Sequence, residues 1–484
     1  MNLLRQKPSF FYIATLAFLA LEVVAVLVQQ WWLMLLPVFL LFCIWTFEKV
    51  HLLFYLLLAT IPWSIEYQFS ETLGTDFPDE PLMWLNAAMA VFFITYTYKN
   101  IGRTNVLHPF VWLLLLQLSW TALTAVTSTY PLLSLKFLLA KSWYLLSFVL
   151  LPVLLITTRE RLKTTALILT ASMTVLVLVT MVRHAAAGFT FATINTSLAP
   201  FFRNHVNYSA LLVCVIPLLV VFINATSKRA TKTALRIFII LCLVALYLSY
   251  ARGAWLALLT GAVAYGLLKK KLLLPAFFLA LILTLASVFW LQHNDRYLAY
   301  AHNYNQTIFH TNFAEHLTAT YELKDMSTAE RFYRWIAGMR MVQDGWKTGF
   351  GPNTFYNNYK PYTVPAFKTW VSANEEHSTV HNYFLLLLIE QGIFGLLFFL
   401  ALLALSFYKA QRIYHATADA FWKAAVAAVA VILVMICTVN FLSDLIETDK
   451  IGSLFYLCLA VLIIADNAVR KEASQPAAHV QRIA

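Results

Sequence analysis

The chain consists mainly of long apolar runs separated by short polar or charged segments. Runs of about 17 to 25 residues with few charges have the length that an α-helix needs to cross a bilayer. The runs are continuous rather than alternating, which favours helices over strands. We predict fourteen spans, beginning near Phe10, Trp31, Val50, Leu82, His108, Ser134, Thr164, His205, Ala234, Gly253, Leu272, Val380, Ala420 and Ile451.

One polar interruption is far longer than the others, and it predicts an extramembrane insertion. It contains Ser327-Thr328-Ala329-Glu330, which fits a helix-starting capping box with Ser327 as the cap. The amphipathic run 331–342 follows, and Asp344-Gly345 is expected to end that helix. Gly349 to Asn353 then predicts a turn. The predicted divisions are a helix bundle at 1–291, the insertion at 292–379 and C-terminal helices at 380–484.

Basic residues follow the same alternation as the spans. Cytoplasmic loops of membrane proteins carry an excess of Lys and Arg. If the N-terminus is cytoplasmic, the basic loops fall on the inner side and the C-terminus is also cytoplasmic. The insertion and two acidic loops, near residues 66–80 and 444–449, then lie on the outer side.

Composition agrees with a polytopic all-α membrane protein of about 12 to 14 transmembrane helices. Of 484 residues, 61% are hydrophobic and 12% are charged, against about 25% charged in soluble domains. The net charge of +12 is then mostly the basic inner flank, so we expect membrane lipids as partners and no nucleic acid. The five cysteines all lie in apolar spans and are expected to be core residues.

Two histidines stand where the insertion meets the next apolar span, and they are the candidate catalytic residues. His377 and His381 are four residues apart, which would place them on one face of a helix. Histidine is the side chain whose ordinary pKa suits proton transfer near neutral pH. The alternative is a purely structural role for either histidine. Glu390 is expected to be a buried, hydrogen-bonded packing residue.

Arginines on the predicted outer side are candidates for binding an anion. Arg252 lies at a tight turn between two apolar runs, and Arg203 precedes another run. Arg331 and Arg334 share a face of the insertion helix. A guanidinium fork matches phosphate oxygens well. The alternatives are interface anchors for Arg252 and Arg203, and pairing with nearby acids for Arg331.

Several other chemistries lack their sequence signatures. The chain has no glycine-lysine phosphate loop, no dinucleotide fingerprint and no Cys/His metal spacing. We therefore expect no cofactor and no metal site, with a divalent cation at the acidic outer loops as the alternative.

An ordered series of motifs resembles the O-antigen ligase and polymerase superfamily of bacterial envelope glycosyltransferases. The series covers roughly residues 200 to 405 and runs from Ser249-Tyr250-Ala251-Arg252-Gly253-Ala254-Trp255 through Glu330-Arg331-Phe332-Tyr333-Arg334-Trp335 and Gly349-Phe350-Gly351-Pro352-Asn353 to His381-Asn382-Tyr383-Phe384 and Glu390-Gln391-Gly392. The sequence departs from the family where Tyr250-Ala251 intervenes between the serine and the arginine.

The resemblance implies a GT-C-like fold with the insertion in the periplasm, in the bacterial inner membrane. It implies transfer of a glycan from undecaprenyl diphosphate to an acceptor hydroxyl, without nucleotide sugar, metal or cofactor. His381 would be the base, with His377 beside it. Arg252 and Arg203, with Arg331 or Arg334, would bind the diphosphate. One displacement step would invert the anomeric centre.

Three functions remain open from the sequence. A ligase would transfer the glycan to a lipid A-core acceptor, whereas the sibling polymerase would transfer it to another lipid-linked repeat. A lipid or glycan transporter without catalysis is the third alternative, and it would require polar residues and broken helices in mid-membrane.

Overall fold

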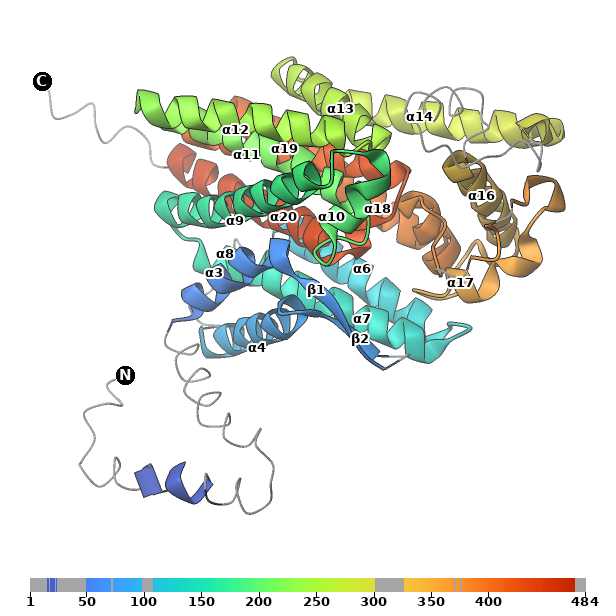
Figure 1. Ribbon diagram of the computed structural model, residues 1–484, viewed down its shortest axis with the longest axis horizontal. Helices are drawn as coiled ribbons and strands as arrows, with labels where there is room; N and C mark the ends of the chain where they lie inside the picture. Colours follow the sequence, from blue (N-terminus) through green and yellow to red (C-terminus); the bar gives the residue numbers. More distant parts are fainter. Residues whose placement is uncertain are drawn as a thin grey trace, which may run out of the picture. The chain divides into compact units, whose positions relative to one another are not determined.

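A computed structural model gives the fold of the chain (Figure 1). It describes residues 49–70, 73–97, 108–300, 326–369, 371–374 and 377–474, with short helical pieces at 15–16, 18–21 and 23. The chain divides into two compact units, residues 1–56 and 57–484, and apart from the first part of α3 (residues 50–56) all features below lie in the second unit. The predicted spans near Phe10 and Trp31 fall largely or wholly outside the described residues.

Every predicted span from Val50 onward corresponds to a helix. These are α3 (Val50–Thr60), α4 (Asp79–Thr97), α6 (Pro109–Val126), α7 (Pro131–Leu145) continuing into α8 (Leu151–Leu155), α9 (Arg159–Ala186), α11 (His205–Ala225), α12 (Arg229–Leu248), α13 (Arg252–Lys269), α14 (Leu273–Gln292), α18 (Tyr383–Ala416), α19 (Ala420–Phe441) and α20 (Asp449–Ser474). Within the described residues, 9 helices are long and apolar enough to cross a membrane. The expected all-α polytopic membrane fold is therefore confirmed.

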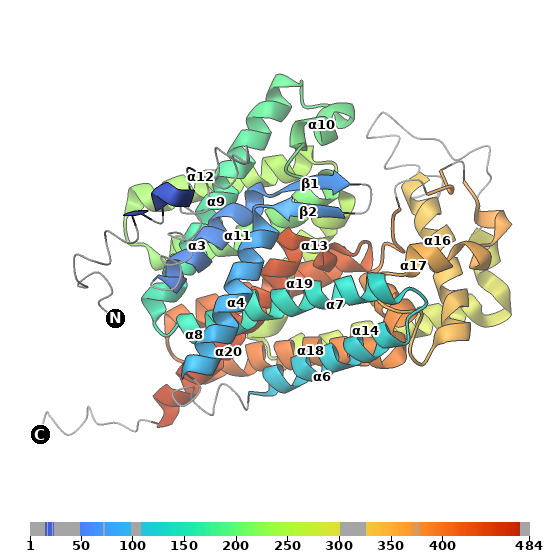
Figure 2. The same ribbon diagram turned by 90° about the horizontal axis from the view of Figure 1, so that it is seen from below.

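Helix α19 is at the centre of the bundle. It packs against α11, α13, α18 and α20, and most of its side chains from Val426 to Val439 are buried. Helix α11 packs against α12 on one side and against α19 on another (Figure 1 and Figure 2). Between Val426 and Val439, helix α19 is mostly apolar on all its sides, which is typical of a helix that other helices enclose.

Helix α18 is broken at Gly392, whose φ of 66° and ψ of −169° no L-residue adopts readily. The preceding carbonyls of Ile389 and Glu390 accept hydrogen bonds from Phe350 N and Gly351 N. The predicted turn at 349–353 thus supplies donors to carbonyls at the helix break. Gly349, Gly351 and Asn353 have positive φ, which confirms the turn.

The insertion is helical and lies at one end of the bundle, next to the start of α18 (Figure 2). It contains α16 (Met326–Gly345) and α17 (Phe355–Asn358). The predicted capping box is wrong, because Ser327 lies inside α16, which already includes Met326. The Glu330 carboxylate accepts hydrogen bonds from the hydroxyls of Thr369 and Ser372 instead.

A two-stranded hairpin joins α3 to α4, where the sequence analysis expected only an acidic loop. Its strands are β1 (Ile65–Ser70) and β2 (Leu73–Phe77), with Glu66 directly opposite Asp76. Apolar and polar residues alternate at Ile65, Glu66, Tyr67 and Gln68, and this pattern is typical of a strand.

The loops gather at the two ends of the bundle as the charge pattern predicts. Segments expected on the outer side contact one another through Arg203 with Glu66 of β1, Lys141 of α7 with Glu447, and Thr379 with Asp444. Loops expected inside meet through Arg159, which pairs with Asp419 and Glu472. Which end faces the cytoplasm stays a prediction, as do the domain boundaries.

Candidate active site

The segment before α18 that contains both histidines is a turn with left-handed residues and not a helix. His377 and His381 both have φ of 53°, and the helix begins at Tyr383 after the cap residue Asn382. Asn382 accepts a hydrogen bond from Leu385 N, which is the usual role of an asparagine cap. The expectation that both histidines share one helix face was therefore wrong.

His381 lies at the rim of the bundle beside an acid from another loop. Its Nδ1 atom is 3.9 Å from Asp444 Oδ1, and 33% of its side chain is exposed. Burial, together with the positive charges of Arg334 and Arg331, lowers the pKa of His381 to about 3. The imidazole is therefore neutral at physiological pH and has a lone pair for a proton.

Thr379 connects the histidine to its surroundings. Its hydroxyl donates to Asp444 Oδ2 at 2.8 Å and accepts from the backbone N of His381 at 3.2 Å. Burial raises the pKa of Asp444 to about 6, and Glu447 adds to this, whereas the Thr379 hydroxyl and Arg203 oppose it. With a pKa of about 6, the Asp444 carboxyl beside the imidazole changes its charge just below neutral pH.

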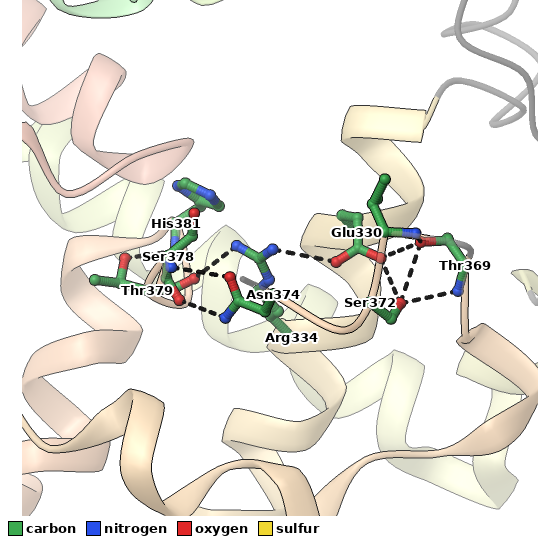
Figure 3. A network of polar contacts seen from close by, with 9 residues as sticks. Glu330, Arg334, Thr369, Ser372, Asn374, Ser378, Thr379 and His381 are labelled. Carbon is green, nitrogen blue, oxygen red and sulfur yellow. Dashed lines mark hydrogen bonds and ion pairs between the residues drawn. The ribbon is translucent and has the colours of Figure 1, made fainter. Parts of the chain in front are cut away.

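Arg334 is buried and connects the insertion helix α16 to the turn that precedes α18 (Figure 3). It is 6% exposed, and it donates to the carbonyl of Thr379 and to Glu330, both at 3.2 Å. Glu330 in turn accepts from the hydroxyls of Thr369 and Ser372. These contacts fix the backbone that leads to His381.

Arg331 and the Arg252 turn converge on the end of α19. Arg331 Nε donates to the carbonyl of Leu442 at 3.2 Å. A Cβ atom placed on Gly253, next to Arg252, would be 3.4 Å from Leu442 Cδ1. Leu442 precedes Asp444 by two residues, so the Arg331 side chain and the backbone next to Arg252 both lie close to the loop that contains Asp444.

Arg203 contacts the hairpin through an ion pair with Glu66. Its Nε and Nη2 atoms donate to the two carboxylate oxygens of Glu66 at 2.8 and 2.6 Å. Its charge also acts on Asp444. The structure therefore brings Arg203 within electrostatic range of the His381 loop, but its fork is engaged by Glu66.

His377 has a different environment from His381. Its ring is exposed and stacks on Tyr356 with 4.0 Å between ring centroids. A proton-transfer role for His377 stays a prediction.

Glu390 is buried, and its carboxylate accepts hydrogen bonds from the backbone N atoms of Asn353, Thr354 and Phe355. This confirms the expected packing role and anchors the 349–353 turn.

Sequence reasoning missed Asp444 and Thr379 as members of the site. Asp444 was noticed only as one of several outer acids, and no local pattern distinguishes it from Glu447 or Asp449. Within the described ranges, no three His, Cys, Asp or Glu residues are grouped so as to hold a metal ion.

The comparison with known families covers the central part of this site. A family model described as O-antigen ligase matches residues 237–400, which include Arg252, Arg331, Arg334, His377 and His381. No curated relative matches the chain. Residues 237–400 are therefore similar to O-antigen ligases, which supports the resemblance to the O-antigen ligase and polymerase superfamily.

Proposed function

We propose that the protein is an O-antigen ligase-like glycosyltransferase of the bacterial inner membrane. It would move a glycan from undecaprenyl diphosphate to a hydroxyl of a lipid A-core acceptor at the periplasmic face. The single observation that supports this most is the neutral, partly exposed His381 beside Asp444, with Arg331 and Arg334 close enough to lower its pKa. A proton acceptor and positive charge are the two things such a transfer needs.

The reaction would be one displacement. The acceptor oxygen attacks the anomeric carbon, its proton passes to His381, and the bond to the phosphate oxygen breaks. Undecaprenyl diphosphate leaves with the bonding electron pair, and the anomeric centre inverts. Asp444, opposite Nδ1, would stabilise the imidazolium that forms.

Arginine charge would stabilise the leaving diphosphate, because fixed donors in a partly dry site act strongly on developing negative charge. Arg331, Arg252 and Arg203 are the candidates for direct contact. Arg334 is buried and engaged by Glu330 and Thr379, so it would act through its charge. An anionic donor bound nearby would also offset the arginine charge and raise the pKa of His381, which makes the imidazole a stronger base.

Reconstitution with a defined glycan donor and two acceptors tests the proposal. The protein in lipid nanodiscs would be given a glycan on undecaprenyl diphosphate with either lipid A-core or a second lipid-linked repeat. We expect transfer to lipid A-core, an inverted linkage by NMR, and no loss of rate in EDTA.

The same experiment distinguishes the alternatives, because the family match does not separate ligase from polymerase. Extension of the lipid-linked repeat alone would assign the polymerase reaction. A retained linkage would contradict the single-step mechanism. No transfer with either acceptor, combined with donor flux across the bilayer when the protein is placed in sealed proteoliposomes, would favour a transporter.

A further inference from the structure

The pairing of Arg203 with Glu66 is the most informative contact that the proposed mechanism does not use. The two carboxylate oxygens meet two nitrogens of the guanidinium at 2.6 and 2.8 Å. This parallel two-point geometry is the one that arginine also uses for phosphate oxygens. Glu66 therefore occupies the guanidinium nitrogens of Arg203 that a diphosphate would bind.

The backbone of Arg203 is held in place by contacts other than the ion pair with Glu66. Phe202 is buried against Tyr208, with the Lys450 ammonium 5.5 Å from its ring. Asn204 caps α11 by accepting from the N atoms of Val206 and Asn207. The Arg203 side chain itself is 71% exposed. It is thus able to change partners without a change in the fold.

The positive charge of Arg203 offsets the acids of the hairpin, together with that of Lys450, on which Asp76 also acts. Glu66 is the direct cross-strand neighbour of Asp76. Like charges opposite each other destabilise a strand pair. Both acids act on Arg203, and so does Asp444 from the site. The guanidinium is therefore within electrostatic range both of the hairpin acids and of the acid next to His381.

We infer that Glu66 holds the place of the donor diphosphate on Arg203, and that donor binding transfers the guanidinium from the hairpin to the lipid. This rests on the proposed function, because it takes Arg203 as a donor contact. An exposed ion pair stabilises by at most about 1 kcal/mol, so a diphosphate with more than one negative charge displaces a single carboxylate readily. When the guanidinium leaves Glu66 for the diphosphate, Glu66 would face Asp76 without that positive charge, and the hairpin would loosen. Donor binding would in this way increase the mobility of the hairpin.

Binding of undecaprenyl diphosphate, without any glycan, tests this directly in nanodiscs. Removing the competing charge in Glu66→Gln is expected to lower the Kd about two- to fivefold, which corresponds to the free energy of an exposed pair. Arg203→Ala is expected to raise the Kd, and Glu66→Gln in the Arg203→Ala background is expected to change nothing further. Glu80→Gln is the matched control, because Glu80 has the same charge and bonds Thr75 of the hairpin instead.

Hydrogen exchange of the 65–77 amides gives a second readout. Exchange is expected to accelerate when undecaprenyl diphosphate binds wild type and to be fast already in Arg203→Ala. A higher Kd in Glu66→Gln would show that Glu66 positions Arg203 for the donor, and an unchanged Kd would show no competition; either result overturns the inference. An unchanged Kd in Arg203→Ala overturns it too, while glycan transfer by the wild type decides the proposed function separately.

Discussion

At the scale of single residues, the site depends on what surrounds His381. The imidazole is kept neutral by burial and by two arginines, and its acidic neighbour Asp444 comes from a loop more than sixty residues away in sequence. Its chemistry is therefore set by side chains from α16 and from the loop after α19. Two predictions follow from these contacts.

Replacing His381 by alanine removes the proposed proton acceptor. General base catalysis contributes about 10²- to 10⁴-fold, so turnover is expected to fall by that factor. Glycan transfer in nanodiscs measures it, with thermal unfolding to show that the variant is folded. His377→Ala is the comparison: its exposed, stacked ring predicts a much smaller loss. Equal losses in both variants would remove the distinction between the histidines.

Asp444 should govern the acid side of the pH profile. Its pKa is raised to about 6, so it is ionised above that pH and loses its charge as the pH falls through it. Because His381 stays neutral down to about pH 3 in the free enzyme, the fall of kcat/KM below about pH 6 is expected to follow Asp444. Asp444→Asn should remove this inflection and lower turnover at neutral pH about 10- to 100-fold, because a negative charge 3.9 Å from Nδ1 would no longer stabilise the imidazolium. An unchanged inflection in Asp444→Asn would assign it to another group.

At the scale of elements, the broken helix α18 and the 349–353 turn form one unit. The turn donates to the Ile389 and Glu390 carbonyls, and the Glu390 carboxylate accepts three backbone donors in return. A Cβ atom on Gly392 would lie 2.2 Å from the carbonyl oxygen of Lys347. Only glycine satisfies both the backbone conformation and the close approach.

Gly392→Ala should therefore destabilise the protein. The strained conformation alone costs about 1 to 3 kcal/mol, and the close contact adds to it. Gly266 is a matched control, because it lies in helix α13 with open space at its Cβ position. Gly266→Ala is expected to be neutral or to stabilise by up to about 1 kcal/mol. Thermal unfolding in detergent compares the two, and an equal effect would contradict the role of Gly392.

At the scale of the whole molecule, the end of the bundle opposite the site has its own polar cluster. The buried Asp466 of α20 accepts from Lys409 of α18 at 2.6 Å and from His108 at 3.1 Å. Arg470 is 2.9 Å from the same oxygen. His108 also accepts from Phe110 N through Nδ1, so Nε2 carries the proton that it donates to Asp466. The cluster joins α6, α18 and α20 far from the His381 loop.

Removing the shared acid should destabilise the fold without altering the chemistry. Asp466→Ala leaves Lys409 buried and unpaired, a change that costs about 3 to 5 kcal/mol. Glu472→Gln at the same end loses only an exposed pair with Arg159 and should cost less than about 1 kcal/mol. Unfolding midpoints and the specific activity of the folded fraction measure both effects. A reduced activity with an unchanged midpoint in Asp466→Ala would contradict a structural role.

The sequence by itself determined the helices, their alternation and the residue types of the site. These features depend on local patterns: span length, the positions of Lys and Arg, and the glycine turn at 349–353. The tertiary structure alone decided the partners. Asp444 became a site residue because the loop after α19 packs against the turn before α18, and Glu66 because a hairpin reaches Arg203. His377 and His381 separated because the turn is held by Asn374, Thr379 and Arg334, contacts that no helical periodicity encodes.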